Sequence, residues 1–583
     1  MFNHPINTQN TLKCFCNFTH NSESAYILIQ MFGSKIKNDS FFYGTLGCLA
    51  FCLFYFQQFS IFFEEYEAYF TSMLAGKITP GISYNHLYYY GQIGISTIYS
   101  KLYSITNNIP WIPLFYEFFL IVAFYLFTKI FFNGLNTFKR FFISFFILLL
   151  INEHLFILNI TRVSFVLIML GSFILLQPNL TNKIKYFAQF IVLFGILTRS
   201  EPAFLTIFLV LFGDFLIYQN FTIKERFMRW LKLFWPHFVL LIVLFIYFQI
   251  DFKTSNQFYK QIEPDVEYQL MVRENFKTIP SNADSIYIMR YQAVKKGIWG
   301  DCETNNNFFL RSLIEKSGSN DDKIISSNYY TIKDLLAKNK PITGLLIVLF
   351  IISLSSTIGK SKKETLMVLA NICALFFVIL IVSIQVKMVD RGFVSLLTIG
   401  CFIYILHIKN RKVTIPKIGL IAVIFIFGYY QINAVSTKLT TLEKEVKHNK
   451  LCLKKVKSVV SKKEIIFLGQ SSINVFFLSQ TPFGASTDFR NVYVFNALAF
   501  TTIEPYRSYL KQKLHCNPNN YLSFFEVALK INCIFLLNKN ESSFLANYLR
   551  IVHHKKITFI PKNNATFRDA FGTLFYAYKI VEY

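Results

Sequence analysis

The chain has few charged residues for its length. Asp, Glu, Lys and Arg make up only 16% of its 583 residues, whereas soluble globular proteins carry about 25%. Hydrophobic residues make up 53% and aromatic residues 18%, including 68 Phe and 33 Tyr. This composition excludes a soluble enzyme, a disordered scaffold, a fibrous protein and a small disulfide-linked domain. It is typical of a chain that lies largely in lipid.

The sequence also lacks the short motifs of several common sites. No CxxC pair, HExxH, Walker A loop, GxSxG or GxGxxG stands out. The missing Walker loop argues against an ATP-driven pump within this chain. The first 40 residues show no signal-peptide layout, since no positively charged start precedes an apolar core and a small-residue cleavage site. The first apolar span is therefore predicted to be a retained insertion signal.

Long apolar runs are abundant instead. A helix needs about 20 residues to cross a hydrocarbon core of ~30 Å, and Phe41–Phe63 supplies 23 residues without a charge. Ten further runs bring the prediction to about 11 transmembrane helices. They are Trp111–Phe132, Phe141–Ile160, Arg162–Gln177, Tyr186–Thr198, Ala203–Tyr218, Leu233–Ile250, Ile342–Ile358, Thr365–Val386, Phe393–His407 and Ile418–Tyr430.

Basic residues follow an alternating pattern along these spans. They gather in every second connecting segment, for example in 183–185, 224–232 and 409–417, and are sparse in the short segments between. Because Lys and Arg stay on the cytoplasmic side, we expect a multi-pass protein of the plasma (inner) membrane with a cytoplasmic N-terminus. The net charge of +26 is thus explained in part by membrane topology, and no nucleic-acid partner is expected.

The expected organisation has three parts. Residues 1–40 form a cytoplasmic segment, 41–430 a transmembrane domain with exoplasmic loops 64–110 and 251–340, and 431–583 an exoplasmic, periplasmic-facing soluble domain. Strand-like runs at 464–469 and 574–580 and helical spacing at 541–552 predict that this domain is α/β or α+β. Its basic charge suits anionic headgroups or phosphate-bearing substrates, or a solvated surface. Cys516 and Cys533 are a candidate disulfide in an oxidising compartment.

Three carboxylates stand directly at the exit of the first span. Glu64, Glu65 and Glu67 begin the first exoplasmic loop. Desolvation and neighbouring carboxylates raise the pKa of an acid, which suits a general base or a ligand for a divalent metal ion. A divalent metal ion is thus a possible cofactor, although the metal ligands are unknown. A solvated acidic loop is the alternative.

The residues that follow have a familiar order. The run Glu64–Phe70 is followed by Gly76 and by the aromatic segment Tyr84–Gln92. This order resembles the GT-C superfamily, polytopic glycosyltransferases that take a sugar from a polyprenyl-phosphate donor, such as protein mannosyltransferases and the aminoarabinose transferases of lipid A. Their first exoplasmic loop opens with an acidic pair or an Asp-Glu-Ala-Tyr-like run. The resemblance implies catalytic roles for the three Glu residues, and substrate-binding roles for His86 and Tyr88.

Two later segments fit the same family. Gly195–Pro202 resembles its Gly-x-x-x-Leu-Thr-Lys/Arg turn, and Val389–Phe393 resembles its late Arg-Tyr-x-x-Pro position. The resemblance implies that Arg199 and Arg391 bind the donor phosphate, because Arg makes charge-assisted, bidentate contacts with phosphate oxygens. Arg162 is a weaker candidate for the same role, and Glu201 is a candidate substrate-binding residue. The alternative for Gly195–Pro202 is a helix hairpin with an Arg–Glu pair.

Three carboxylates fall inside predicted spans, namely Glu117, Glu153 and Asp214. Intramembrane carboxylates are costly and are often functional. All three lie within about two turns of a span end, so we expect them to be hydrated at the interface.

The leading functional hypothesis is an inverting membrane glycosyltransferase. It would move a sugar from a polyprenyl-phosphate donor to an exoplasmic glycan, lipid or protein acceptor. A lipid-linked glycan polymerase or ligase of another polytopic class, a transporter or flippase, and a non-catalytic scaffold remain alternatives. The acidic first loop discriminates among them, because only the transferase requires it.

Overall fold

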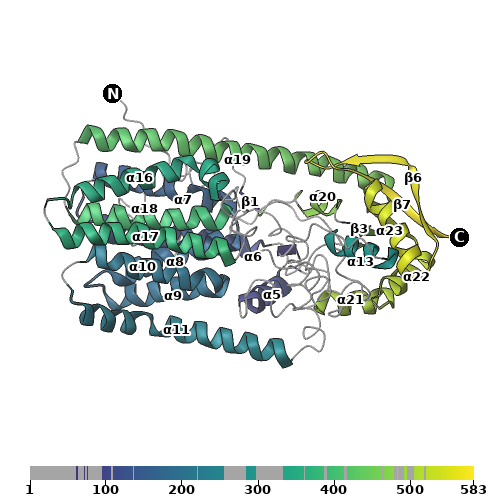
Figure 1. Cartoon of the computed structure of the whole chain (residues 1–583), viewed down its shortest axis with the longest axis horizontal. Helices are drawn as coiled ribbons and strands as arrows, with labels where there is room; N and C mark the ends of the chain where they lie inside the picture. Colours follow the sequence, from purple (N-terminus) through teal and green to yellow (C-terminus); the bar gives the residue numbers. More distant parts are fainter. Residues whose placement is uncertain are drawn as a thin grey trace.

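The computed structural model describes most of the chain after residue 94 and short pieces before it. The described residues are 61–63, 71–72, 75, 95–106, 109–135, 137–218, 221–254, 284–296, 332–359, 361–385, 390–411, 417–461, 464–469, 471–477, 479, 482, 491–494, 504–517 and 520–583. They form a bundle of long helices and, beyond one end of it, a domain built on a β-sheet (Figure 1).

One helix corresponds to each predicted span after residue 63. These are α6 (Trp111–Phe132), α7 (Thr137–Phe156), α8 (Ile160–Leu176), α9 (Asn182–Thr198), α10 (Glu201–Ile217), α11 (Ile223–Thr254), α16 (Lys340–Ser355), α17 (Lys362–Gln385), α18 (Asp390–Asn410) and α19 (Lys417–Val459). Within the described ranges, four helices are long and apolar enough to cross a membrane. The number is five if the short helix Ile332–Lys338 and α16, which meet at a bend of 91°, count as one span. The predicted helical membrane fold is confirmed.

The bundle is built around α8 and α18, which are apolar on all sides. Every residue of α8 is buried, as is α18 from Gly392 to His407, as expected for helices at the centre of a membrane bundle. Helices α8 and α9 approach closely at Gly171, where a Cβ atom would lie 2.6 Å from Val192 Cγ2. Such small residues let membrane helices pack backbone to backbone.

The outer helices carry exposed apolar side chains. Phe245 of α11 is 64% exposed and Phe377 of α17 is 61% exposed. In lipid such faces are in their preferred solvent, because the hydrocarbon core requires apolar side chains. Helix α11 lies along one edge of the bundle in Figure 1. These faces therefore mark the lipid-contacting surface.

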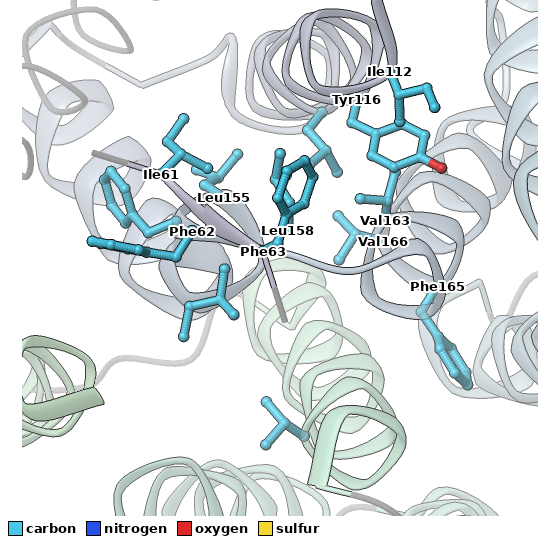
Figure 2. Close-up of a cluster of buried hydrophobic side chains, with 14 of the residues drawn as sticks. Ile61, Phe62, Phe63, Ile112, Tyr116, Leu155, Leu158, Val163, Phe165 and Val166 are labelled. Carbon is cyan, nitrogen blue, oxygen red and sulfur yellow. The ribbon is translucent and has the colours of Figure 1, made fainter. Parts of the chain in front are cut away.

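A short parallel pairing joins the first predicted span to the third. Strand β1 (Phe62–Phe63) pairs with β2 (Ile157–Leu158), with Phe63 opposite Leu158. Figure 2 shows these side chains in a buried apolar cluster with Leu155 and Val163. Strand β2 lies between α7 and α8. The helix predicted over Phe141–Ile160 therefore ends at Phe156, four residues earlier than expected.

The C-terminal domain contains a mixed five-stranded sheet. Its strands are β3 (Ile465–Leu468), β4 (Val492–Val494), β5 (Cys533–Leu537), β6 (Ile557–Arg568) and β7 (Leu574–Glu582), in the order β4-β3-β5-β7-β6. The first three are parallel, while β7 is antiparallel to β5 and β6. Helices α20 (Ile473–Phe477), α21 (Glu504–Leu514), α22 (Tyr521–Lys530) and α23 (Lys539–Val552) accompany it.

The disulfide predicted in this domain is absent. Cys516 and Cys533 are both buried free thiols. The thiol of Cys533 donates a hydrogen bond to the Ala528 carbonyl at 3.2 Å. Burial raises the pKa of Cys533 to about 12, so this side chain behaves as a small apolar residue of strand β5. The prediction of a disulfide was wrong.

Helix α19 crosses the domain boundary proposed after Tyr430. It continues without a break to Val459 and has 43 residues. At 1.5 Å per residue its length is about 64 Å, roughly twice the thickness of a hydrocarbon core. It contacts α7, α16 and β1 in the bundle, and α20 and β6 in the sheet domain. The helix α13 (Ser285–Lys295), from the second long loop, packs against α23 of the same domain.

Candidate active site

A partly buried ion network lies at the end of the bundle that faces the sheet domain. Arg162 Nη1 of α8 is 2.9 Å from Glu153 Oε1 of α7, and Arg162 Nη2 is 3.6 Å from Asp390 Oδ2 of α18. Lys438 Nζ of α19 is 2.9 Å from the same Glu153 oxygen and 3.3 Å from the same Asp390 oxygen. Two cations and two carboxylates from four helices thus neutralise one another.

The local sequence explains how Glu153 and Arg162 meet. Helix α7 ends at Phe156, two residues pair in β2, and Asn159 caps α8 by accepting a hydrogen bond from the Thr161 backbone N–H at 2.8 Å. The chain reverses at this point, so Arg162 in the first turn of α8 returns to the last turn of α7. Its side chain is 1% exposed. A charge at this depth requires a partner.

The prediction that the intramembrane carboxylates are hydrated is wrong for two of them. Glu153 is 4% exposed and Asp214 is completely buried. Each is paired with basic side chains, because a buried carboxylate without a counter-charge would be too costly. For Asp214 these are Arg226 at 3.0 Å and Arg229 at 2.9 Å.

The Asp214 cluster lies toward the other end of the bundle. Asp214 is near the end of α10, whereas the ion network lies level with the start of that helix. The Asp214 carboxylate also accepts a hydrogen bond from Trp230 Nε1 at 2.9 Å. Arg229 Nη2 in turn donates to the Leu176 carbonyl at 2.6 Å. This cluster ties α10, α8 and α11 together, and we assign it a structural role.

Arg199 lies beside the ion network. Its Nη1 donates to Thr161 Oγ1 at 2.5 Å, and its Nε is 3.2 Å from Glu201 Oε2. The helical stretch is interrupted here, because α9 ends at Thr198 and α10 begins at Glu201. Ser164 fixes the turn by donating to the carbonyls of Gly195 and Arg199. The segment is therefore a helix hairpin with an Arg–Glu pair, and it holds the Arg199 guanidinium next to Thr161.

Arg391 lies in the first turn of α18, next to Asp390 of the ion network. It is half-buried and follows Asp390, whose Oδ1 accepts a hydrogen bond from Asn339 Nδ2 at 2.7 Å. Asn339 stands at the sharp bend before α16. The three arginines predicted to bind phosphate thus gather at one end of the bundle. Arg162 faces two carboxylates of the network, and Arg199 is paired with Glu201.

The acidic residues of the first loop are not among the described residues. Glu64, Glu65, Glu67, His86 and Tyr88 all lie outside them. Phe63, which precedes Glu64 in the sequence, is opposite Leu158, which precedes Asn159 and the arginine-bearing start of α8. Because paired parallel strands run in one direction, Phe63 lies at the edge at which the chain leaves Leu158 and enters α8.

Three polar residues of this site had escaped the functional interpretation of the sequence. Glu153 and His154 adjoin within an apolar run, and a charge in such a run is itself a signal. His154 is completely buried, and neither of its ring nitrogens has a hydrogen-bond partner within the described ranges. Lys438 lies in the stretch that the sequence assigns to the soluble domain, where a lysine is ordinary and does not indicate a functional site.

A metal site is not evident in the part of the chain that the structure describes. No group of three His, Cys, Asp or Glu side chains there lies close enough to hold an ion. The described part of the site is therefore an ionic and hydrogen-bonding centre with an excess of arginine. Such a centre can hold an anionic group and stabilise charge that develops on it.

Comparisons with known proteins identify two similar solved structures. Both are of ArnT from Cupriavidus metallidurans, one in the apo state and one bound to undecaprenyl phosphate. Each is 8% identical and matches 91% of this chain and 97% of its own, with TM-scores of 0.35 and 0.33. At such low similarity, neither an activity nor a residue role is transferred. No family model matches the chain, and no curated protein matches it significantly.

Proposed function

We propose that this protein is a membrane glycosyltransferase that moves a sugar from a polyprenyl-phosphate donor to an acceptor hydroxyl at the outer face of the membrane. The acceptor would be a glycan, a lipid or a protein. The observation that carries the proposal is the β1–β2 pairing. It brings the residue before the acidic first loop next to the residues that lead into Arg162, and Thr161 in turn contacts Arg199.

The arginines supply the phosphate end of the proposed reaction. Arg199 has an 18% exposed side chain, and its ion-pair partner Glu201, at 3.2 Å, is itself half-exposed. A phosphate monoanion or dianion can join such a guanidinium through bidentate hydrogen bonds. Arg391 approaches from α18. Together they would hold the polyprenyl phosphate as it leaves and stabilise its developing charge.

The first-loop acids supply the acceptor end. One of Glu64, Glu65 and Glu67 would take the proton from the acceptor hydroxyl as that oxygen attacks the anomeric carbon. The bond from this carbon to the phosphate oxygen breaks on the opposite side, so the configuration inverts. A general base of this kind contributes about 10²–10⁴-fold to the rate. Ordering of the donor by the arginines contributes through proximity.

The membrane orientation is part of the proposal. The site lies at the end of the bundle next to the sheet domain (Figure 1). In the charge-based topology this is the exoplasmic, or periplasmic, side of the plasma membrane. The polyprenyl chain would then lie along the lipid-facing helices, with its phosphate at the level of Arg199.

The test is a transfer assay with the purified full-length protein in lipid nanodiscs and a polyprenyl-phosphate-linked sugar. Glu64→Gln, Glu65→Gln and Glu67→Gln are assayed one at a time, together with Arg199→Gln. We expect one of the Glu variants to lose about 10²-fold or more of the rate, and Arg199→Gln to raise the KM for the donor.

The matched control is Glu526→Gln, which removes a partly exposed carboxylate of the sheet domain that lies 3.7 Å from Lys555. It should transfer at the wild-type rate. Full activity of all three first-loop variants would refute the assignment of the base. Translocation of the lipid-linked sugar without formation of a new glycosidic bond would replace the transferase by a flippase.

A further inference from the structure

Helix α19 joins the two halves of the molecule. Among the described elements, it is the helix that contacts both the bundle, through α7, α16 and β1, and the sheet domain, through α20 and β6. Its distal half also holds the β6–β7 hairpin, since Asn449 Oδ1 accepts from the Ala570 backbone N–H at 3.0 Å and His448 Nε2 lies 2.9 Å from the Arg568 carbonyl oxygen. The position of α19 along its axis therefore sets the position of the hairpin.

Two polar residues of α19 fix it against α7. Lys438 is ion-paired with Glu153, and Gln431 Nε2 donates to Asn152 Oδ1 at 3.3 Å. Gln431 and Lys438 are seven residues apart, so they lie on one face of the helix, two turns from each other. Asn152 and Glu153 are neighbours near the end of α7. These contacts select one register out of those that the apolar face of α19 would permit.

Lys438 also reaches the residues that we place in the transfer site. Its second partner, Asp390, lies within reach of Arg162 and precedes Arg391. Helix α19 further contacts β1, the strand that precedes the first-loop acids. One lysine therefore connects the helix that carries the sheet domain with both parts of the proposed site.

We propose that Lys438 is a positioning residue that sets the axial register of α19 and so holds the sheet domain in place over the acceptor side of the transfer site. This inference rests on the proposed function. A slip of α19 by one residue would move the sheet domain by about 1.5 Å and turn it by about 100°. In the slipped register Lys438 would point away from both carboxylates. Its ion pairs with Glu153 and Asp390 can therefore form in one register only.

The test compares Lys438→Met and Lys438→Arg in the full-length protein, with Lys444→Met as the matched control. Lys444 is an exposed lysine of the same helix. Spin labels are introduced through a keto-bearing unnatural amino acid at Phe204 of α10 and Lys530 of α22, both exposed. Their separation is measured by pulsed EPR, and transfer is measured in parallel with the donor and the acceptor varied in turn.

We expect Lys438→Met to broaden or shift the distance distribution and to raise the KM for the acceptor about tenfold, while the KM for the donor stays within about twofold. Lys438→Arg should restore both, because it retains the charge. Lys444→Met should match the wild type. A Lys438→Met protein with unchanged distances and an unchanged acceptor KM would overturn the inference.

Two further outcomes separate this inference from the proposed function. A wild-type protein that transfers no sugar refutes the function, and the EPR distances then decide the register by themselves. Equal losses for donor and acceptor, with an unchanged distance distribution, refute the positioning role while the transferase assignment stands.

Discussion

The ion network gives a stability prediction that follows directly from its geometry. Glu153 Oε1 is shared by Arg162 and Lys438, each at 2.9 Å. Glu153→Gln keeps the shape of the side chain and removes its charge. Of the two carboxylates of the network, Asp390 then remains charged, 3.6 Å from Arg162 and 3.3 Å from Lys438. Removing one partner from a buried pair costs about 3–5 kcal/mol. We expect about 3 kcal/mol, because Asp390 stays in place.

The assay is the free energy of unfolding, measured by SDS titration in mixed micelles. Arg162→Met should cost about the same, since Glu153 keeps Lys438 as a partner. The double variant should be more stable than the sum of the two losses predicts, by about 2 kcal/mol, because neighbours in one network are not additive. Glu443→Gln is the control: its pair with Lys447 is exposed and should contribute less than about 1 kcal/mol. Additivity within about 0.5 kcal/mol would refute the shared network.

Three other predictions concern regions away from this network. Asp214→Asn should lower stability by about 3–5 kcal/mol, since it leaves two arginines unpaired, but the transfer rate per folded molecule should not change. Gly171→Val should cost about 1–3 kcal/mol through overpacking, whereas Gly344→Val, with no atom within 4 Å of its Cβ, should cost little. Both comparisons use the same SDS titration. In the sheet domain, burial tends to raise the pKa of Glu464, but hydrogen bonds, mainly from Lys562, outweigh it and hold the pKa below its usual value. This pair stabilises the domain above about pH 4.3 and loses its effect as pH falls further, so Glu464→Gln should flatten the acid limb of a plot of Tm against pH.

The bundle could be predicted because length and hydropathy decide whether a helix lies in a membrane. Each predicted span after residue 63 corresponds to one helix. The strands β3 and β7 could be predicted for a similar reason, since they are short apolar runs rich in β-branched and aromatic residues.

The length of α19 was missed although its signal was present. Beyond Tyr430, Val435, Leu439, Val446, Leu453 and Val456 recur at intervals of three, four or seven residues and are all buried. This is the spacing of an amphipathic helix. No window after Tyr430 is long and apolar enough to span a membrane, which favours a soluble domain, but an apolar stripe along one face is enough for a packed helix.

The ion network could not be predicted from the sequence. Glu153 and Lys438 are separated by 285 positions, and their contact depends on how two helices are rotated against each other. Hydropathy determines that a helix is in the membrane, but not which of its side chains faces which neighbour. Even so, a carboxylate inside an apolar run, such as Glu153, implies that a cation from another part of the chain lies beside it.

The long helix also has a mechanical consequence. If α19 is clamped at Lys438, the 21 residues that follow to Val459 form a stiff arm of about 32 Å. A tilt of roughly 5° about the clamp would displace the far end of this arm by about 3 Å, comparable to the distance over which a hydrogen bond forms or breaks. The arm would therefore amplify small rearrangements at the membrane surface into larger displacements of the sheet domain. Conversely, a force on the sheet domain would be transmitted to the ion pairs of Lys438.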